Sequence, residues 1–239
     1  MKDKTLVIGA GEIGTSLGNV LAETYEVDWH DPQREKNATG TYAVINITYP
    51  YSDKFIDITR EYVGRYKPEL AIIHSTVPPG TTEKFGRGFV HSPVNGKHPN
   101  LTNDIKVFVK FIGANDAYSG YKAVQYLHKA GIPTKLFSSS RATEVAKILC
   151  TTRYGMAILE MKETIKVCNE YKVPFHEVYS AWNQAYNAGC LKLERSQFVR
   201  PVLDPIQGEI GGHCVVNNTK LLKSFCTELV AKANKEYKK

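Results

Sequence analysis

The stretch that most constrains the fold of this chain is residues 5–18. An apolar, β-rich run at 5–8 leads into Gly-Ala-Gly-Glu-Ile-Gly, a G-x-G-x-x-G turn, and the apolar residues that follow recur at helical spacing. The glycines therefore join a strand to a helix, which is the context in which this pattern binds a dinucleotide. Gly9 permits the tight turn, Gly11 lets a pyrophosphate approach the backbone, and Gly14 lets the helix pack close to the strand.

A second strand is expected at residues 26–30, and it ends at Asp31. Asp31 lies twenty residues after Gly11, where an acidic side chain can bind the ribose 2′-hydroxyl of the cofactor. We expect NAD rather than NADP, because a carboxylate repels a 2′-phosphate. The residues expected to bind this cofactor lie at strand ends and at the first helix: Gly9, Gly11, Glu12, Ile13, Gly14, Asp31, Thr48 and Thr76.

The composition argues against several classes of protein. The 239 residues are 42% hydrophobic and 23% charged, which is ordinary for a globular protein. No apolar run approaches the ~20 residues that cross a membrane, and no signal peptide is evident. The net charge of +7 is scattered, so it suits an anionic cofactor and substrate better than nucleic acid. Five cysteines without paired spacing predict reduced thiols in a cytoplasmic protein, and the histidines show no metal-ligand spacing.

Strand-like and helical stretches alternate along the first half of the chain. Further strands are expected at 42–48, 70–75, 89–92 and 107–113. Helices are expected at 53–66, with Asp53 as the N-cap, and at 115–130. The alternation predicts an α/β fold with a Rossmann-type doubly wound parallel sheet, in which ligands bind outside the carboxyl ends of the strands.

The second half of the chain is predicted to be helical. Residues 141–171 predict a helix of roughly eight turns, and shorter helices are expected at 175–188, ended by Gly189, and at 221–233. We therefore expect an NAD-binding Rossmann domain at 1–138 and a helical dimerisation or substrate domain at 139–239. The long central helix exceeds what the residues after it can bury, which predicts a homodimer.

Two side chains of the helical half are candidates for chemistry. Lys147 shares a helix face with Thr143 and Thr151. A lysine near an apolar wall can act as a base or polarise a substrate, whereas the alternative is a solvated surface lysine. Cys214 follows several glycines and precedes a helix, so its thiolate could attack an aldehyde, with His213 as a proton donor. The alternative for Cys214 is a small buried hydrophobe.

The loop at 76–82, Thr-Val-Pro-Pro-Gly-Thr-Thr, follows the fourth strand. Two prolines set its shape, and Thr76 and Thr81 could present hydroxyls to the cofactor. The alternative is a turn without a binding role.

Four motifs occur in one order along the chain: the glycine turn at 9–14, Ser-Thr-Val-Pro-Pro-Gly-Thr-Thr at 75–82, Ala-Lys at 146–147 and Gly-Gly-His-Cys at 211–214. Together they resemble the nucleotide-sugar 6-dehydrogenases, the UDP-glucose, UDP-N-acetylmannosamine and GDP-mannose dehydrogenase family, over residues 5 to about 225. The resemblance implies oxidation of a sugar C6 alcohol to a carboxylate with two NAD. It implies that Lys147 supports proton transfer, that Cys214 captures the aldehyde, and that Thr76 helps position water.

Three positions depart from the pattern of that family. Val94 and Asn218 stand where the family has carboxylates, and Thr151 stands where it has asparagine. We also expect the third domain of the family to be absent from this sequence, as in a fragment or in a protein with a smaller substrate. These departures leave two alternatives open. One is a two-electron dehydrogenase of a β-hydroxyacid, which needs only Lys147 and the cofactor. The other is a catalytically weakened NAD-binding regulatory protein.

Overall fold

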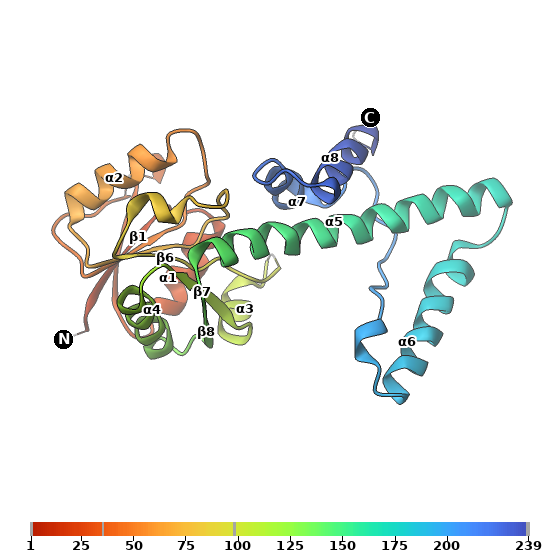
Figure 1. Ribbon diagram of the computed structural model, residues 1–239, viewed down its shortest axis with the longest axis horizontal. Coiled ribbons are helices and arrows are strands. Elements are labelled where there is room, and N and C mark those ends of the chain that lie inside the picture. The colour runs from red at the N-terminus through yellow and green to blue at the C-terminus, as the bar shows by residue number, and fades with distance from the viewer. Residues whose placement is uncertain (1, 35, 98, 238–239) are drawn as a thin grey trace. The chain divides into compact units, whose positions relative to one another are not determined.

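The computed structural model describes residues 2–34, 36–97 and 99–237 (Figure 1). The chain divides into two compact units, Met1–Lys147 and Ile148–Lys239, and each is described by itself below. Within the described residues, no helix is both long enough and apolar enough to span a bilayer.

Unit 1 is built on one sheet, and its described residues form eight strands in the order β3-β2-β1-β4-β5-β6-β7-β8. The pairs β2–β1, β1–β4, β4–β5 and β5–β6 are parallel, as the alternating pattern predicts. The strands are β1 Lys4–Ile8, β2 Glu26–Asp31, β3 Lys36–Asn37, β4 Val44–Ile47, β5 Leu70–Ile73, β6 Phe89–His91, β7 Lys110–Ala114 and β8 Thr134–Phe137.

The sheet is not parallel throughout, which corrects the sequence prediction toward both edges. β7 runs antiparallel to β6, β8 runs parallel to β7, and β3 is antiparallel to β2. Residues 107–109, expected in a strand, lie outside it because 101–107 form a helix that buries Leu101 and Ile105 one turn apart. The strand β8 was missed because Thr134–Phe137 is short and only half-buried.

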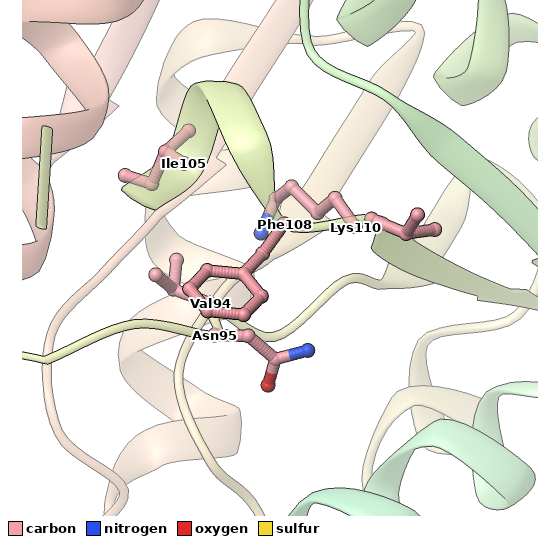
Figure 2. Close-up of a pocket in the computed structure, with 6 residues that line it drawn as sticks. Val94, Asn95, Ile105, Phe108 and Lys110 are labelled. Atoms are coloured by element: carbon pink, nitrogen blue, oxygen red, sulfur yellow. The ribbon is translucent and has the colours of Figure 1, made fainter. Parts of the chain in front are cut away.

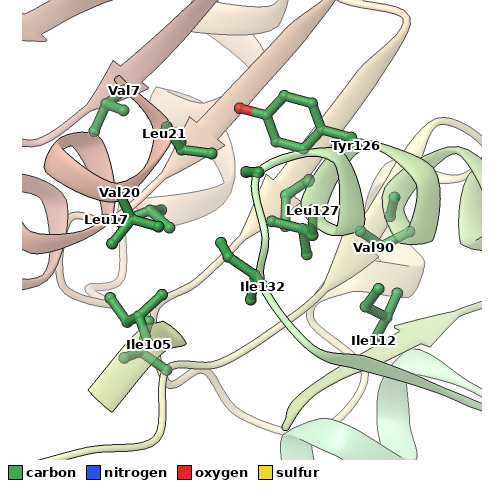
Figure 3. Close-up of a cluster of buried hydrophobic side chains, with 14 of the residues drawn as sticks. Val7, Leu17, Val20, Leu21, Val90, Ile105, Ile112, Tyr126, Leu127 and Ile132 are labelled. Atoms are coloured by element: carbon green, nitrogen blue, oxygen red, sulfur yellow. The ribbon is translucent and has the colours of Figure 1, made fainter. Parts of the chain in front are cut away.

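Helices cover both faces of the sheet, so the doubly wound architecture is confirmed. Alternate strand residues point to opposite faces. Val7, Ile72 and Val90 pack with the helices on one side (Figure 3), and residues such as Ile45 and Ile73 pack with Phe55 and Tyr66 on the other. The helices of unit 1 are α1 Glu12–Leu21, α2 Phe55–Tyr66, α3 Leu101–Val107 and α4 Ala117–Lys129, with short 3₁₀ turns at Pro32–Arg34 and Thr82–Phe85.

Helix α2 ends at Tyr66 as expected but begins differently. Lys54 occupies its N-cap position and makes no side-chain cap hydrogen bond, so Asp53 is not the cap. Lys67, in the left-handed conformation, ends the helix.

The long helix α5, Ser140–Tyr171, begins in unit 1 and continues into unit 2, close to the predicted bounds. Unit 2 adds a π-helical turn at His176–Ala181, α6 Trp182–Lys192, a 3₁₀ turn at Ser196–Phe198, α7 Gly212–Thr219 and α8 Phe225–Tyr237. Gly189 does not end α6, since a single helical glycine costs only about 1 kcal/mol. Gly155 lets α7 and α8 approach α5, because a Cβ there would lie 2.8 Å from Val215 and 2.9 Å from Val230.

Candidate cofactor and active site

The glycine turn between β1 and α1 leaves an open cradle. Gly9 adopts φ +102° and its N–H donates to the carbonyl of His30 at 2.9 Å. A Cβ on Gly14 would lie 1.9 Å from the Gly9 oxygen, so only glycine lets the helix pack here. A Cβ on Gly11, in contrast, would meet nothing within 4 Å. The space beside Gly11 and the position of the Glu12 and Ile13 N–H groups at the start of α1 suit the phosphates of a dinucleotide.

Asp31 lies at the carboxyl end of β2, beside this turn. Its Oδ2 accepts a hydrogen bond from the Ala10 N–H at 2.6 Å, and its Oδ1 accepts one from the Gln33 N–H at 3.0 Å. A carboxylate has about four acceptor sites, so Asp31 retains capacity for a ribose diol. Thr48 supports the turn from the end of β4, because its hydroxyl lies 2.9 Å from the Ile8 carbonyl and 2.8 Å from that of Gly9.

The loop after β5 is held by a buried carboxylate that the sequence did not reveal. Glu144, on the first turns of α5, accepts hydrogen bonds from the N–H of Gly80 at 2.5 Å and from the N–H and hydroxyl of Thr82 at 2.9 and 2.7 Å. Burial raises the pKa of Glu144, although these three hydrogen bonds oppose that rise. Thr81 is buried and its hydroxyl donates to the Pro78 carbonyl, so Thr81 is turned into its own loop, whereas Thr76 is partly exposed.

The first turns of α5 are also fixed to the end of β6. The Nε2 of His91 lies 3.1 Å from the Ser75 carbonyl and must donate to it, so in the neutral ring Nδ1 accepts from the Thr143 hydroxyl at 2.8 Å. Complete burial lowers the pKa of His91 to about 3. Gly113 of β7 permits the helix to lie this close, because a Cβ there would lie 2.3 Å from the Thr143 oxygen.

Lys147 completes this edge of unit 1. Its Nζ donates to the Val94 carbonyl at 2.7 Å, and its side chain is partly buried. The Val94 side chain is itself buried, at 6% exposure. The residues 92–94 follow the carboxyl end of β6, so Lys147 lies at the edge of the sheet that also carries the glycine turn and Asp31.

Cys214 belongs to unit 2, on the first turn of α7, and it is exposed. The backbone just before it, at Gly211 and Gly212, has φ of +67° and +47°, the left-handed region in which glycine is the residue of least strain. Two of the positions that depart from the family pattern meet here, because the Asn218 amide donates to the Thr151 hydroxyl at 3.2 Å. The side chain of His213 lies outside the described part of the structure.

Comparison with known proteins places the fold. No protein-family model and no curated protein sequence matches the chain. Solved structures do match, and they share the Rossmann-type sheet followed by a long helix.

Three of the matching structures are dehydrogenases of two kinds. The chain is similar to the UDP-D-ManNAc dehydrogenase of Pyrococcus horikoshii, with a TM-score of 0.80 and 17% identity over 98% of this chain and 68% of that one. It is similar to the UDP-glucose dehydrogenase of Pyrobaculum islandicum, with a TM-score of 0.73 and 15% identity over 99% and 68%. It is also similar to the 3-hydroxyisobutyrate dehydrogenase of Mycobacterium tuberculosis, with a TM-score of 0.72 and 12% identity over 99% and 94%. About a third of each nucleotide-sugar enzyme thus has no counterpart in these 239 residues.

Proposed function

We propose that this chain is an NAD-dependent oxidoreductase that oxidises an alcohol of a nucleotide sugar. The observation that carries the proposal is that the open cradle at Gly11, the Asp31 carboxylate and the amine of Lys147 all lie at the carboxyl edge of one sheet. The similar structures named above include dehydrogenases of nucleotide sugars, and another similar structure holds NADP+. The division of labour that we propose is an NAD-binding domain at 1–138 and a dimerisation or substrate domain at 139–239.

The bound nicotinamide would accept hydride from the alcohol carbon. The chain supplies the remaining groups. Residues 9–14 hold the pyrophosphate at the N-terminus of α1, and Asp31 accepts hydrogen bonds from the ribose diol. Thr48 and Thr76, at the ends of β4 and β5, would contact the cofactor. Lys147 takes up the hydroxyl proton and stabilises the developing oxyanion.

Oxidation beyond the aldehyde would depend on Cys214. Its thiolate would add to the aldehyde carbon to give a thiohemiacetal, whose oxidation by a second NAD would leave a thioester that water opens to the acid and the free thiol. Opening the thioester needs a group that activates water. Neither Val94 nor Asn218 accepts a proton near neutral pH, and the loss of a general base typically costs ~10²–10⁴-fold in rate. We therefore expect the reaction to stall at the acyl-enzyme or to release aldehyde.

A two-electron dehydrogenase of a β-hydroxyacid is the second candidate. Its support is the match to 94% of a 3-hydroxyisobutyrate dehydrogenase, a chain of similar extent. This reaction needs Lys147 and the cofactor but not Cys214. A weakened NAD-binding regulatory protein would bind NAD and turn over neither substrate. Product analysis separates the three: an acyl-enzyme, aldehyde or acid from a nucleotide sugar, a carbonyl from a hydroxyacid, or bound NAD without product.

We also propose that the chain assembles as a homodimer through α5 and α6. Large apolar side chains on these helices are exposed, among them Tyr171 at 71% and Trp182 at 69%. Large apolar side chains exposed in number favour an interaction surface, because extended exposed apolar patches are uncommon on monomers. A second copy of the chain would cover it.

Two glycine substitutions test the cofactor site as a matched pair. Gly11→Ala meets open space at a backbone conformation that alanine adopts, so the variant should fold normally yet lose NAD binding. Gly14→Ala meets the Gly9 oxygen and should lower stability as well. Native-like NAD affinity in Gly11→Ala would show that the pyrophosphate does not lie at this turn.

Mass spectrometry of protein incubated with NAD and a panel of nucleotide sugars tests the chemistry. A covalent adduct on Cys214 is expected, and Cys214→Ala should abolish it while leaving NAD binding intact. Rapid multiple-turnover production of acid would contradict the expected stall.

A further inference from the structure

Lys110 is the first residue of β7, and it is buried although the sequence around it does not predict this. Its side chain is 3% exposed. The Nζ donates to the Ser92 carbonyl at 2.6 Å and to the Pro93 carbonyl at 3.1 Å. A lysine is almost never fully buried unless its amine is satisfied, and here two backbone carbonyls satisfy it.

The surroundings of Lys110 favour its neutral form. Burial lowers its pKa well below the ordinary value of 10.5, and the positive charge of Lys147 lowers it further. Three titratable groups act on this region: His74 after β5, His91 on β6 and Lys147 on α5.

The two lysines bind consecutive peptide carbonyls. Lys110 holds the carbonyls of residues 92 and 93, and Lys147 holds the next one, that of Val94. A cavity of about 10 Å³ lies beside this segment and is lined by Val94 and Phe108 as well as Lys110 (Figure 2). The β6–β7 ladder ends at His91. Beyond it, the Ser92 N–H donates to the Ile73 carbonyl at 2.8 Å, and the Ser92 carbonyl also lies 3.0 Å from Nδ1 of His74. Lys110 adds a hydrogen bond to that carbonyl and another to the carbonyl of Pro93.

We propose that Lys110 is a positioning residue for Lys147: it holds the carbonyls of Ser92 and Pro93 and thereby places the Val94 carbonyl to which the Lys147 amine is bound. The proposal deepens the proposed function, on which it rests for the catalytic use of Lys147. Side chains that orient a reactive group from behind are needed because a reactive amine displaced by 1 Å loses much of its effect.

The test measures the accessibility of the Lys147 amine by pulse acetylation of native protein, with mass spectrometry resolving each lysine. Lys110→Met keeps a straight apolar chain and removes both N–H donors. We expect acetylation of Lys147 to become about fivefold faster, the factor that corresponds to one hydrogen bond of about 1 kcal/mol. We also expect the pH profile of Lys147 acetylation to move toward lower pH, because the ammonium form loses a fixed acceptor.

Lys162→Met is the matched control. Lys162 is also buried, and its Nζ donates to the backbone carbonyl of Ile206 in unit 2. Its removal should leave the acetylation of Lys147 unchanged. Lys110→Gln, which keeps an uncharged N–H donor group, should give an intermediate rate, and it replaces Lys110→Met if that variant does not fold.

An unchanged Lys147 rate and pH profile in the Lys110 variants would overturn the proposal, as would an equal increase in Lys162→Met. The measurement needs neither cofactor nor substrate. Absence of turnover therefore counts against the proposed function alone, and an unresponsive Lys147 counts against the positioning role alone.

Discussion

His91 makes the stability of unit 1 depend on pH in a way that can be calculated. The ordinary histidine pKa is 6.5, and in the folded protein burial lowers that of His91 to about 3. Between these values the unfolded chain binds a proton that the folded chain does not. Stability from this group is therefore complete above pH 6.5 and is lost as the pH falls toward 3.

The expected loss of unfolding free energy follows from the pH range between the unfolded and folded pKa values of His91. Between pH 6.5, where the unfolded histidine is half protonated, and pH 4.5 it amounts to about 2.3 kcal/mol, about 1.7 factors of ten at 1.36 kcal/mol each. His74, which is also completely buried with its pKa lowered by burial, acts in the same direction. A loss of this size is a large part of the 5–15 kcal/mol that stabilises a typical domain.

The assay compares the native protein with His91→Gln by urea denaturation at pH 6.5, 5.5 and 4.5. Glutamine offers one donor and one acceptor, which match the Ser75 carbonyl and the Thr143 hydroxyl, and it does not titrate. Carboxylates titrate equally in both proteins, so the difference between their unfolding free energies isolates His91. That difference should shift by about 2.3 kcal/mol in favour of the variant between pH 6.5 and 4.5. Parallel loss of stability in the two proteins, or an NMR signal of the His91 ring that titrates near pH 6, would refute the reasoning.

Three further predictions concern the loop, the cofactor and assembly. Glu144→Gln should lower the unfolding free energy by about 3 kcal/mol in urea denaturation, because the amide cannot accept from all three donors of Gly80 and Thr82; a loss below about 0.5 kcal/mol, typical of surface sites, would contradict the role of Glu144. Asp31→Ala should weaken NAD roughly 10-fold or more while NADP changes little, by fluorescence titration, since hydrogen bonds to a charged group are worth about 1.5–3 kcal/mol; tight NADP binding by the native protein would mean that Asp31 does not select. Trp182→Glu should give a monomer by light scattering at micromolar concentration, whereas a native protein that is already monomeric would exclude the dimer.

The parts of the fold that could be predicted from the sequence are those that local patterns specify. Local patterns predict the conformation of the glycine turn and of the apolar strands β1, β4 and β5. The long run of helix formers likewise predicts α5. The direction of β7 could not be predicted from the sequence. The same apolar run can pair parallel or antiparallel, and its neighbouring strand determines which. β8 and the residues 107–109 were misjudged for a related reason, since exposed and edge positions carry a weak alternation.

The candidate site was predictable where a motif marks it and not where charges are buried. Lys147 and Asp31 stood out by spacing. Glu144 and Lys110 resemble surface residues in sequence, because their partners, Gly80, Thr82 and residues 92–93, are distant in the chain. A signal was present for Glu144 in hindsight: it lies one turn before Lys147 on the same helix. For Lys110, the only signal in the sequence is that a lysine occurs within an apolar strand.

The reversed pair β7–β8 also has a consequence for the order of events during folding. Because β7 and β8 run antiparallel to β6, β8 ends at the edge of the sheet opposite the carboxyl ends of the parallel strands. Helix α5 begins there, beside Asn115, and its first turns run past His91 to Val94 at the carboxyl edge. The contacts that hold this segment join residues 25 to 64 positions apart. Such contacts form only after the intervening loops have closed. We expect the segment that carries Lys147 to dock late, on a sheet that is already assembled. During refolding, the backbone amides of β1 and β4 should therefore become protected from hydrogen exchange before those of α5.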